Sequence, residues 1–277
     1  MRIAQISTVD APVLQTGSGA IEGLVWLLSR ELTRLGHEVT VFGVAGSEPC
    51  GELVATLPDT ADSFNDWPIG EWINLCRAVE ESHRFDVLHS HGYLWGLPLE
   101  PLAKAPMVHT LHLWPHRDEA YLWSTAPAAC VTAVSNCQWS KYPELKPAAT
   151  IYHGVDASQF TFRLEPDDYV CFLGHFTGSK GPTIAIEASR ALGVRLLLAG
   201  PLNDYYREHV EPLVDGRSVE YVGYVSGSER DQLLGRAARA AEENPPLQML
   251  DLEGRRSQPR LDEPRAKRAV HRPATPG

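Results

Sequence analysis

The sequence has few cysteines and no continuous apolar run of the roughly 18 residues that a membrane-spanning helix needs. Its five cysteines form no C-x-x-C pair and show no zinc spacing. Such a scattered, odd-numbered set is typical of reduced thiols in a cytosolic protein. No basic-then-apolar leader opens the chain. We therefore expect a cytoplasmic protein with no transmembrane segment, and the cysteines indicate no metal site.

Positive charge is also scarce. The chain has 25 Lys and Arg against 35 Asp and Glu, which gives a formal net charge of -10. A nucleic acid would gain no general electrostatic attraction from this balance, so we expect no nucleic-acid partner. The length of 277 residues and the 43% hydrophobic content suit one large or two medium α/β domains.

Strands and helices alternate through the first part of the chain. A strand at Ile3–Ser7, an amphipathic helix at Ile21–Leu35 and a strand at Val39–Val44 predict a βαβ unit and hence a parallel sheet. Residues 46–68 are interpreted as a loop. The further expected elements are helices at Ile69–Ser82 and Asn136–Lys141, and strands at Phe85–His91, Met107–Leu111, Cys130–Ser135 and Thr150–His153. This pattern predicts an α/β domain of about six or seven parallel strands over residues 1–160.

A second, smaller domain is predicted over residues 168–237, after a linker. It opens with a strand at Val170–Leu173, a helix from Pro182 to Leu192 and a strand at Val194–Ala199. The remaining elements expected here are a helix at Tyr205–Val214, a strand at Val219–Tyr221 and a helix at Ser228–Ala237.

Lys180 lies in the loop just before the helix that begins at Pro182. Backbone N–H groups, the helix dipole and an ammonium group converge there, which favours an anion as ligand. An ordinary surface lysine in a βα turn is the alternative, and these residues alone favour neither interpretation.

Gly17 and Gly19 precede the first helix, as the glycines of a dinucleotide-binding site would. However, Gly17 comes about ten residues after the first strand, and Val39–Val44 ends without an acid for the ribose. An NAD-dependent Rossmann enzyme is therefore a distant alternative.

Residues 238–277 differ in composition from the rest. Arg, Pro and Ala dominate, and neither helical nor strand periodicity persists. We expect a disordered, basic and Pro-rich tail. A solvated tail without a partner is favoured over one that binds an acidic partner.

Several motifs occur in one order along residues 1–237: MRIAQIS, SGAIE, GHEVTVF, FDVLHSHG, VHTLH, AVSNCQ, IYHGVDASQF, FLGHFTGSKGPTIAIEA, LLLAGP and VEYVGYVSGSERDQLLGRA. In these motifs the chain resembles the retaining family 4 glycosyltransferases of GT-B fold. The resemblance implies two Rossmann-like domains, with a nucleotide-sugar donor bound mainly by the second and an acceptor mainly by the first. It also implies transfer with retention at the anomeric carbon and no metal or other cofactor.

The resemblance also implies roles for individual residues. His112 matches the histidine of the T-x-H motif, which faces the donor sugar and is the candidate catalytic residue; a histidine paired inside the fold is the competing interpretation. That second interpretation suits His89, His91 and His109 better. The candidate donor-binding residues are Gly17, Gly19, Gly174, His175 and Lys180. Among these, Lys180 matches the lysine that binds the diphosphate, and Gly19 a glycine whose missing Cβ lets backbone approach the phosphates, unless it serves only a turn.

The chain also departs from the family pattern. His175 stands where the family usually has Arg, and His153 where it usually has Asn. The family's acidic motif, E-x7-E, does not follow Ala237, and we interpret the compositional change there as a truncation or frameshift. The alternative function is therefore a catalytically inactive remnant that binds an acceptor or partner. The sequence identifies neither the base, the sugar nor the acceptor.

Overall fold

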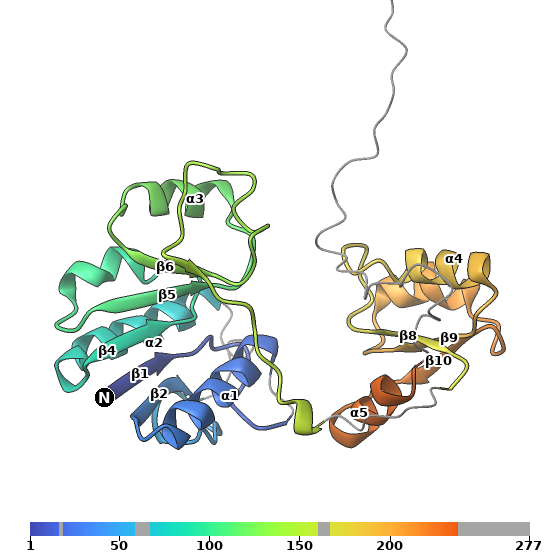
Figure 1. Cartoon of the computed structure of the whole chain (residues 1–277), viewed down its shortest axis with the longest axis horizontal. Coiled ribbons are helices and arrows are strands. Elements are labelled where there is room, and N and C mark those ends of the chain that lie inside the picture. Colours follow the sequence, from blue (N-terminus) through green and yellow to red (C-terminus); the bar gives the residue numbers. More distant parts are fainter. Residues whose placement is uncertain (17–18, 59–66, 160–166, 238–277) are drawn as a thin grey trace, which may run out of the picture.

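The computed structural model describes residues 1–16, 19–58, 67–159 and 167–237 and contains two separate parallel sheets (Figure 1). The first sheet has seven strands in the order β3-β2-β1-β4-β5-β6-β7, and the second has three in the order β10-β9-β8. All of their pairings are parallel. The predicted α/β class is thus confirmed, whereas Gly17 and the predicted tail lie outside the described residues.

The strands of the first sheet are β1 (Arg2–Ile6), β2 (Glu38–Val44), β3 (Glu52–Leu57), β4 (Val87–Ser90), β5 (Met107–Leu111), β6 (Cys130–Ala133) and β7 (Ala149–Thr150). Its helices are α1 (Ala20–Arg34), α2 (Trp67–Glu80) and α3 (Arg117–Ser124). The second sheet consists of β8 (Val170–Leu173), β9 (Leu196–Ala199) and β10 (Val219–Gly223), with helices α4 (Pro182–Leu192) and α5 (Gly227–Arg236).

Helices cover both faces of the first sheet, because alternate residues of a strand point to opposite faces. In β2, Val39 and Val41 pack against α1, where Val25 and Trp26 are buried. Phe42, on the other face of β2, packs in a cluster with Leu75, Ala78 and Val79 of α2. The first sheet is therefore doubly wound, and its carboxyl edge is left to the loops.

Two elements of the first sheet were absent from the sequence prediction. Residues 46–68 were expected to form a loop, but Glu52–Leu57 forms β3, which pairs in parallel with β2. Leu57 is the one buried residue of this strand, so the strand lacks the regular alternation of buried and exposed side chains that would have predicted it. The short helix α3 was missed as well, because only Ala120 and Trp123 of its eight residues are buried.

The predicted helix at Asn136–Lys141 is wrong; this segment forms turns. Its backbone closes i,i+3 turns instead, with the Ser140 N–H donating to the Cys137 carbonyl at 3.1 Å and the Tyr142 N–H to the Trp139 carbonyl at 2.8 Å. The buried side chain of Gln138 holds the start of the segment, because its Oε1 accepts from the Val134 N–H at 2.7 Å and its Nε2 donates to the Leu111 carbonyl at 2.7 Å. The strand predicted at Thr150–His153 is likewise shorter, since pairing ends at Thr150.

Two further details differ from prediction. In α2, Trp72, Ile73 and Cys76 are exposed, although their side chains were expected to be available for burial. In the second sheet, the helix expected at Tyr205–Val214 is a π-helical turn at Tyr206–Val210 followed by a 3-10 turn at Glu211–Leu213. Pro212 has no N–H to donate, which prevents a continuous α-helix there.

The three-stranded sheet has its own core. Phe172, Phe176, Ile186, Leu196, Leu198, Tyr206, Val210 and Val219 form one buried cluster. The end of α5 returns to the start of this unit, because Tyr169 Oη donates to the Leu233 carbonyl at 2.8 Å and Arg236 pairs with Asp167 at 2.7 Å. None of the helices in the described ranges is both long and apolar enough to cross a bilayer.

Candidate functional site

Four polar side chains lie in a row at the carboxyl edge of the first sheet, and we call this row the histidine chain: Gln5, His91, His112 and His153. His91 directly follows β4, and His112 directly follows β5. β4 lies between β1 and β5, so Gln5 of β1 is on the other side of His91. Ligands of open α/β sheets bind at this edge, outside the carboxyl ends of the strands.

Short distances join these side chains. Nε2 of His91 donates to Oε1 of Gln5 at 2.7 Å, since an amide oxygen only accepts. Nδ1 of His91 lies 2.9 Å from Nε2 of His112. Nδ1 of His112 lies 3.4 Å from Nε2 of His153, and these two rings stack with their centroids 5.2 Å apart. His153 is exposed, so the histidine chain runs from the buried core to the surface of the protein.

Burial keeps these imidazoles neutral. It lowers the pKa of His112 to about 3 and the pKa of His91 well below its usual value. The neighbouring histidines add to both shifts, because a second positive charge nearby disfavours protonation. Burial also lowers the pKa of His153. The site therefore offers hydrogen bonds but no positive charge at neutral pH.

The other strand histidines lie inside the fold, as the competing interpretation anticipated. Nε2 of His89 lies 2.7 Å from Oγ1 of Thr110, and burial lowers the pKa of His89 to about 4. His109 is fully buried; its Nε2 lies 3.5 Å from Oε2 of Glu100, and neither ring nitrogen forms a hydrogen bond to a described residue. His91 differs from both, because it contacts His112 directly.

Two buried carboxyl groups, those of Glu22 and Glu71, hold the loop between β1 and α1. Oε1 of Glu22 accepts from Oγ1 of Thr8 at 2.6 Å. Oε1 of Glu71, in α2, accepts from the Val9 N–H at 3.0 Å. Gly19 is the N-cap of α1, and a Cβ built there would lie 2.2 Å from Oε2 of Glu22. The glycine therefore makes room for a carboxylate of the chain itself, while its predicted role at the donor phosphates stays a prediction.

The loop after β8 carries the other predicted donor residues. Gly174 has φ +154, a conformation that favours glycine, and its N–H donates to the Ala199 carbonyl at 3.0 Å. Phe176 is fully buried and packs against Tyr206 with centroids 4.9 Å apart. Asn203 Nδ2 donates to the Phe176 carbonyl at 2.9 Å. The loop is therefore anchored at its centre.

His175 and Lys180 lie on either side of the buried Phe176 in this loop, and both are exposed. Lys180 lies two residues before the first residue of α4, with Gly181 as the N-cap at φ +70. No hydrogen bond or ion pair joins either side chain to another described residue. Gly174, His175 and Lys180 thus share one loop, while His112 belongs to the histidine chain of the first sheet.

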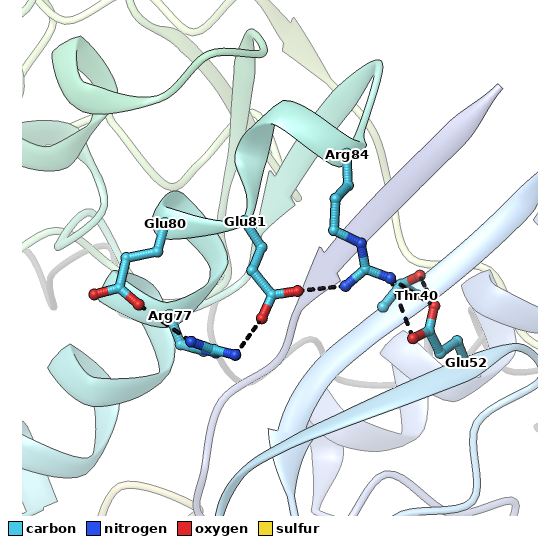
Figure 2. A network of polar contacts seen from close by, with 6 residues as sticks. All are labelled: Thr40, Glu52, Arg77, Glu80, Glu81 and Arg84. Carbon is cyan, nitrogen blue, oxygen red and sulfur yellow. Dashed lines mark hydrogen bonds and ion pairs between the residues drawn. The ribbon is translucent and has the colours of Figure 1, made fainter.

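Other polar features lie at the opposite edge of the first sheet. A hollow of about 660 Å³ is lined there by residues at the amino ends of β1 and β2. Figure 2 shows the adjacent network, in which Arg84 bridges Glu81 and Glu52, and Glu52 accepts from Thr40 at 3.1 Å. These ion pairs tie the end of α2 to β2 and β3. Within the described ranges, no three or more His, Cys, Asp or Glu side chains are arranged to hold a metal ion.

Sequence reasoning missed Gln5, Glu22 and Glu71. Glu71 and the buried Asn74 lie three residues apart on the inner face of α2, which is the signal that could have identified them. Gln5 gave no such signal, because its contact with His91 depends on the strand order.

Comparison with known proteins gives matches in sequence and in fold. The profile of Glycosyltransferase Family 4 matches residues 21–159. A D-inositol 3-phosphate glycosyltransferase of Corynebacterium aurimucosum is 34% identical over 139 residues, covering 40% of this chain and 32% of that protein. The protein of the same name from Streptosporangium roseum is 33% identical over 134 residues, covering 40% and 31%. The matched part spans about a third of the length of these curated relatives.

Solved structures show the same fold at low identity. AviGT4, a glycosyltransferase involved in avilamycin A biosynthesis, is similar with a TM-score of 0.61 at 22% identity, covering 86% of this chain and 68% of that one. A sucrose-phosphate synthase from Thermosynechococcus elongatus gives 0.63 at 17% identity, covering 86% and 74%. Both support the GT-B arrangement. Because the family profile covers half of the sequence, in the predicted acceptor-side domain, we conclude that the chain belongs to Glycosyltransferase Family 4.

Proposed function

We propose that this protein transfers a sugar from a nucleotide-diphosphate sugar to an acceptor, with retention of the anomeric configuration and without a metal. The observation that carries the proposal is the position of His112, at the carboxyl end of β5 inside the segment that matches the family. The loop of Lys180, at the corresponding edge of the second sheet, gives further support.

Each residue has a distinct role in this proposal. Lys180 binds the donor diphosphate and offsets the negative charge that develops on the β-phosphate as the sugar leaves. His112, which is neutral, contacts the sugar by hydrogen bonding. The leaving phosphate helps to deprotonate the acceptor, so the protein contributes positioning and electrostatics rather than a base.

The names of the curated relatives suggest a first acceptor to test. Both are D-inositol 3-phosphate glycosyltransferases, and their similarity to this chain lies in its first part. We therefore propose inositol 3-phosphate, a phosphorylated polyol, as the first acceptor to offer.

Binding without transfer is the second candidate function. It is favoured by His175, which stands where the family usually has an arginine. An imidazole lacks the permanent charge and the bidentate fork of a guanidinium group, so it holds a diphosphate less firmly. In this case the chain binds an acceptor or a partner and releases no product.

A transfer assay separates the two candidates. The full chain is incubated with inositol 3-phosphate and a panel of nucleotide-diphosphate hexoses, and products are detected by mass spectrometry. We expect one glycoside whose anomeric configuration equals that of the donor by NMR, with and without EDTA. Lys180→Ala should lower the rate about 100-fold or more, whereas Lys146→Ala, at another exposed lysine, should leave it unchanged. Inversion of the anomeric carbon would refute the retaining mechanism, and binding without product would favour the second candidate.

A further inference from the structure

The histidine chain determines which ring nitrogen of His112 faces a ligand. We propose that Gln5 and His91 hold His112 with its proton on Nε2, so that Nδ1 accepts a hydrogen bond from a ligand hydroxyl and does not bind a phosphate oxygen. That the hydroxyl belongs to a sugar rests on the function proposed above. Gln5 and His91 are positioning residues in this proposal, since they act through His112.

Which atom donates in each hydrogen bond of the histidine chain follows from Gln5 at its buried end. The Oε1 atom of Gln5 only accepts, so the Nε2 of His91, 2.7 Å away, carries a proton. A neutral imidazole has one proton, which leaves the Nδ1 of His91 as an acceptor. The Nε2 of His112, 2.9 Å from that atom, must therefore donate, and the Nδ1 of His112 keeps its lone pair.

Burial supports the neutral forms that this argument needs. Gln5 and His91 are almost fully buried, at 1% and 3% exposure. Burial also lowers the pKa of both His91 and His112. A second proton on His112 would place a charge beside three other imidazoles, those of His89, His91 and His153.

The free lone pair points toward the exposed end of the chain. Among the described residues, the Nδ1 of His112 has one contact there, a long one of 3.4 Å with the Nε2 of His153. A bond of this length is weaker than the two inner ones, and His153 is exposed. A ligand hydroxyl that donates at a normal distance can therefore displace His153.

The lone pair on Nδ1 of His112 also determines which ligand groups cannot bind there. An unprotonated phosphate oxygen, as in the diphosphate of a nucleotide sugar, is an acceptor, so it would face the Nδ1 lone pair without a proton between them. Nor does neutral His112 offer charge to an anion. The carboxyl edge of the first sheet is therefore selective for hydroxyl groups at this position, whatever binds near Lys180.

NMR of the full chain with 15N-labelled histidine tests the proposal without any need for transfer. Long-range 1H–15N spectra distinguish a protonated ring nitrogen from an unprotonated one, and His112→Asn assigns the signals. At neutral pH we expect His112 to be protonated on Nε2 and unprotonated on Nδ1. A protonated Nδ1 in the unmodified chain would overturn the proposal, even if no variant folded.

Variants of Gln5 test the positioning role. Gln5→Leu removes the terminal acceptor and should lower the ratio of the Nε2-protonated to the Nδ1-protonated form of His112 by about fivefold. Gln15→Leu, at an exposed glutamine of the same unit, is the control and should leave the ratio unchanged. An unchanged ratio in Gln5→Leu would mean that Gln5 does not set the tautomer.

Titration with inorganic pyrophosphate provides the ligand test. We expect the His112 ring signals to stay unchanged up to millimolar pyrophosphate, and protonation of Nδ1 on binding would overturn the selectivity. These outcomes are separate from those of the transfer assay. A chain with the expected tautomer but no product refutes only the proposed function, whereas a transferring chain with the opposite tautomer refutes only this inference.

Discussion

Oε1 of Glu71, in α2, accepts a hydrogen bond of 3.0 Å from the backbone N–H of Val9 in the loop after β1. Its Oε2 atom is buried and has no hydrogen-bond partner among the described residues. Burial raises the pKa of Glu71 to about 8, and the negative charges of Asp10 and Glu22 add to the shift. The loop between β1 and α1 is thus held by a carboxyl group that keeps its proton at neutral pH.

This pKa makes stability depend on pH. Between about pH 4.5 and pH 8, the folded chain keeps a proton on Glu71 that the unfolded chain loses. The free energy of unfolding should therefore fall as pH rises through this window, by up to about 1.4 kcal/mol per pH unit, and level off above it. Glu71→Gln, which keeps an acceptor for Val9, should flatten the dependence, as urea unfolding at several pH values would measure. Glu80→Gln, at the exposed end of the same helix, is the control. A Glu71→Gln profile that parallels that of the unmodified chain would show that Glu71 ionises normally.

The backbone of Gly200, just after β9, lies very close to the backbone of Gly174 in the loop after β8. A Cβ at Gly200 would lie 2.0 Å from the carbonyl oxygen of Gly174, whereas a Cβ at Gly178 would meet nothing nearer than 3.6 Å. Gly200→Ala should therefore lower the free energy of unfolding by about 1–3 kcal/mol. Gly178→Ala should change it little, and thermal unfolding measures both. Equal stability of the two variants would show that the backbone yields without strain.

An arginine at position 175 should strengthen anion binding. His175→Arg adds a charged, bidentate donor to the loop that carries Lys180, and a hydrogen bond to a charged group contributes about 1.5–3 kcal/mol. Pyrophosphate affinity should rise about tenfold or more in calorimetric titration. His83→Arg, at an exposed histidine of the first unit, should have no such effect. If both variants gained equally, the effect would come from net charge alone.

The domain limits, residues 1–160 and 168–237, remain a proposal. Asp156 accepts from Arg30 of α1 at 2.8 Å, which ties the end of the first unit to its own helix. Limited proteolysis should release a resistant fragment that contains this ion pair and ends near residue 160. Early cleavage within α1 or β4 would contradict the proposed limits.

The fold was predictable where the apolar pattern of a segment and the Gly or Pro residues at its ends indicated the same element. β5, β8 and α4 begin and end where the sequence predicts, because apolar runs there are bounded by Gly or Pro. β3 and α3 were not predicted, because neither buries enough side chains to produce a periodic apolar pattern in the sequence. In the segment Asn136–Lys141, the backbone bonds join residues three apart, as between Ser140 and Cys137, and therefore form turns where the predicted helix needs bonds between residues four apart.

The candidate site was predictable only in part, for a different reason. The family resemblance led to His112 and Lys180 as single residues. The contact between His112 and His91 follows from the pairing of β4 with β5, and the contact with Gln5 from the pairing of β1 with β4. Sequence spacing does not reveal which strands are neighbours, so neither contact was predicted, although His91 is buried and paired inside the fold as expected.

Calorimetric titration of the full chain with a nucleoside diphosphate tests the central claim, that Lys180 binds the donor diphosphate. We predict saturable binding, at millimolar order with His175 in place of the usual arginine, that Lys180→Ala weakens at least tenfold and Lys146→Ala leaves unchanged. Affinity that is equal in the unmodified chain and in Lys180→Ala would contradict the claim, as would the absence of binding even to pyrophosphate.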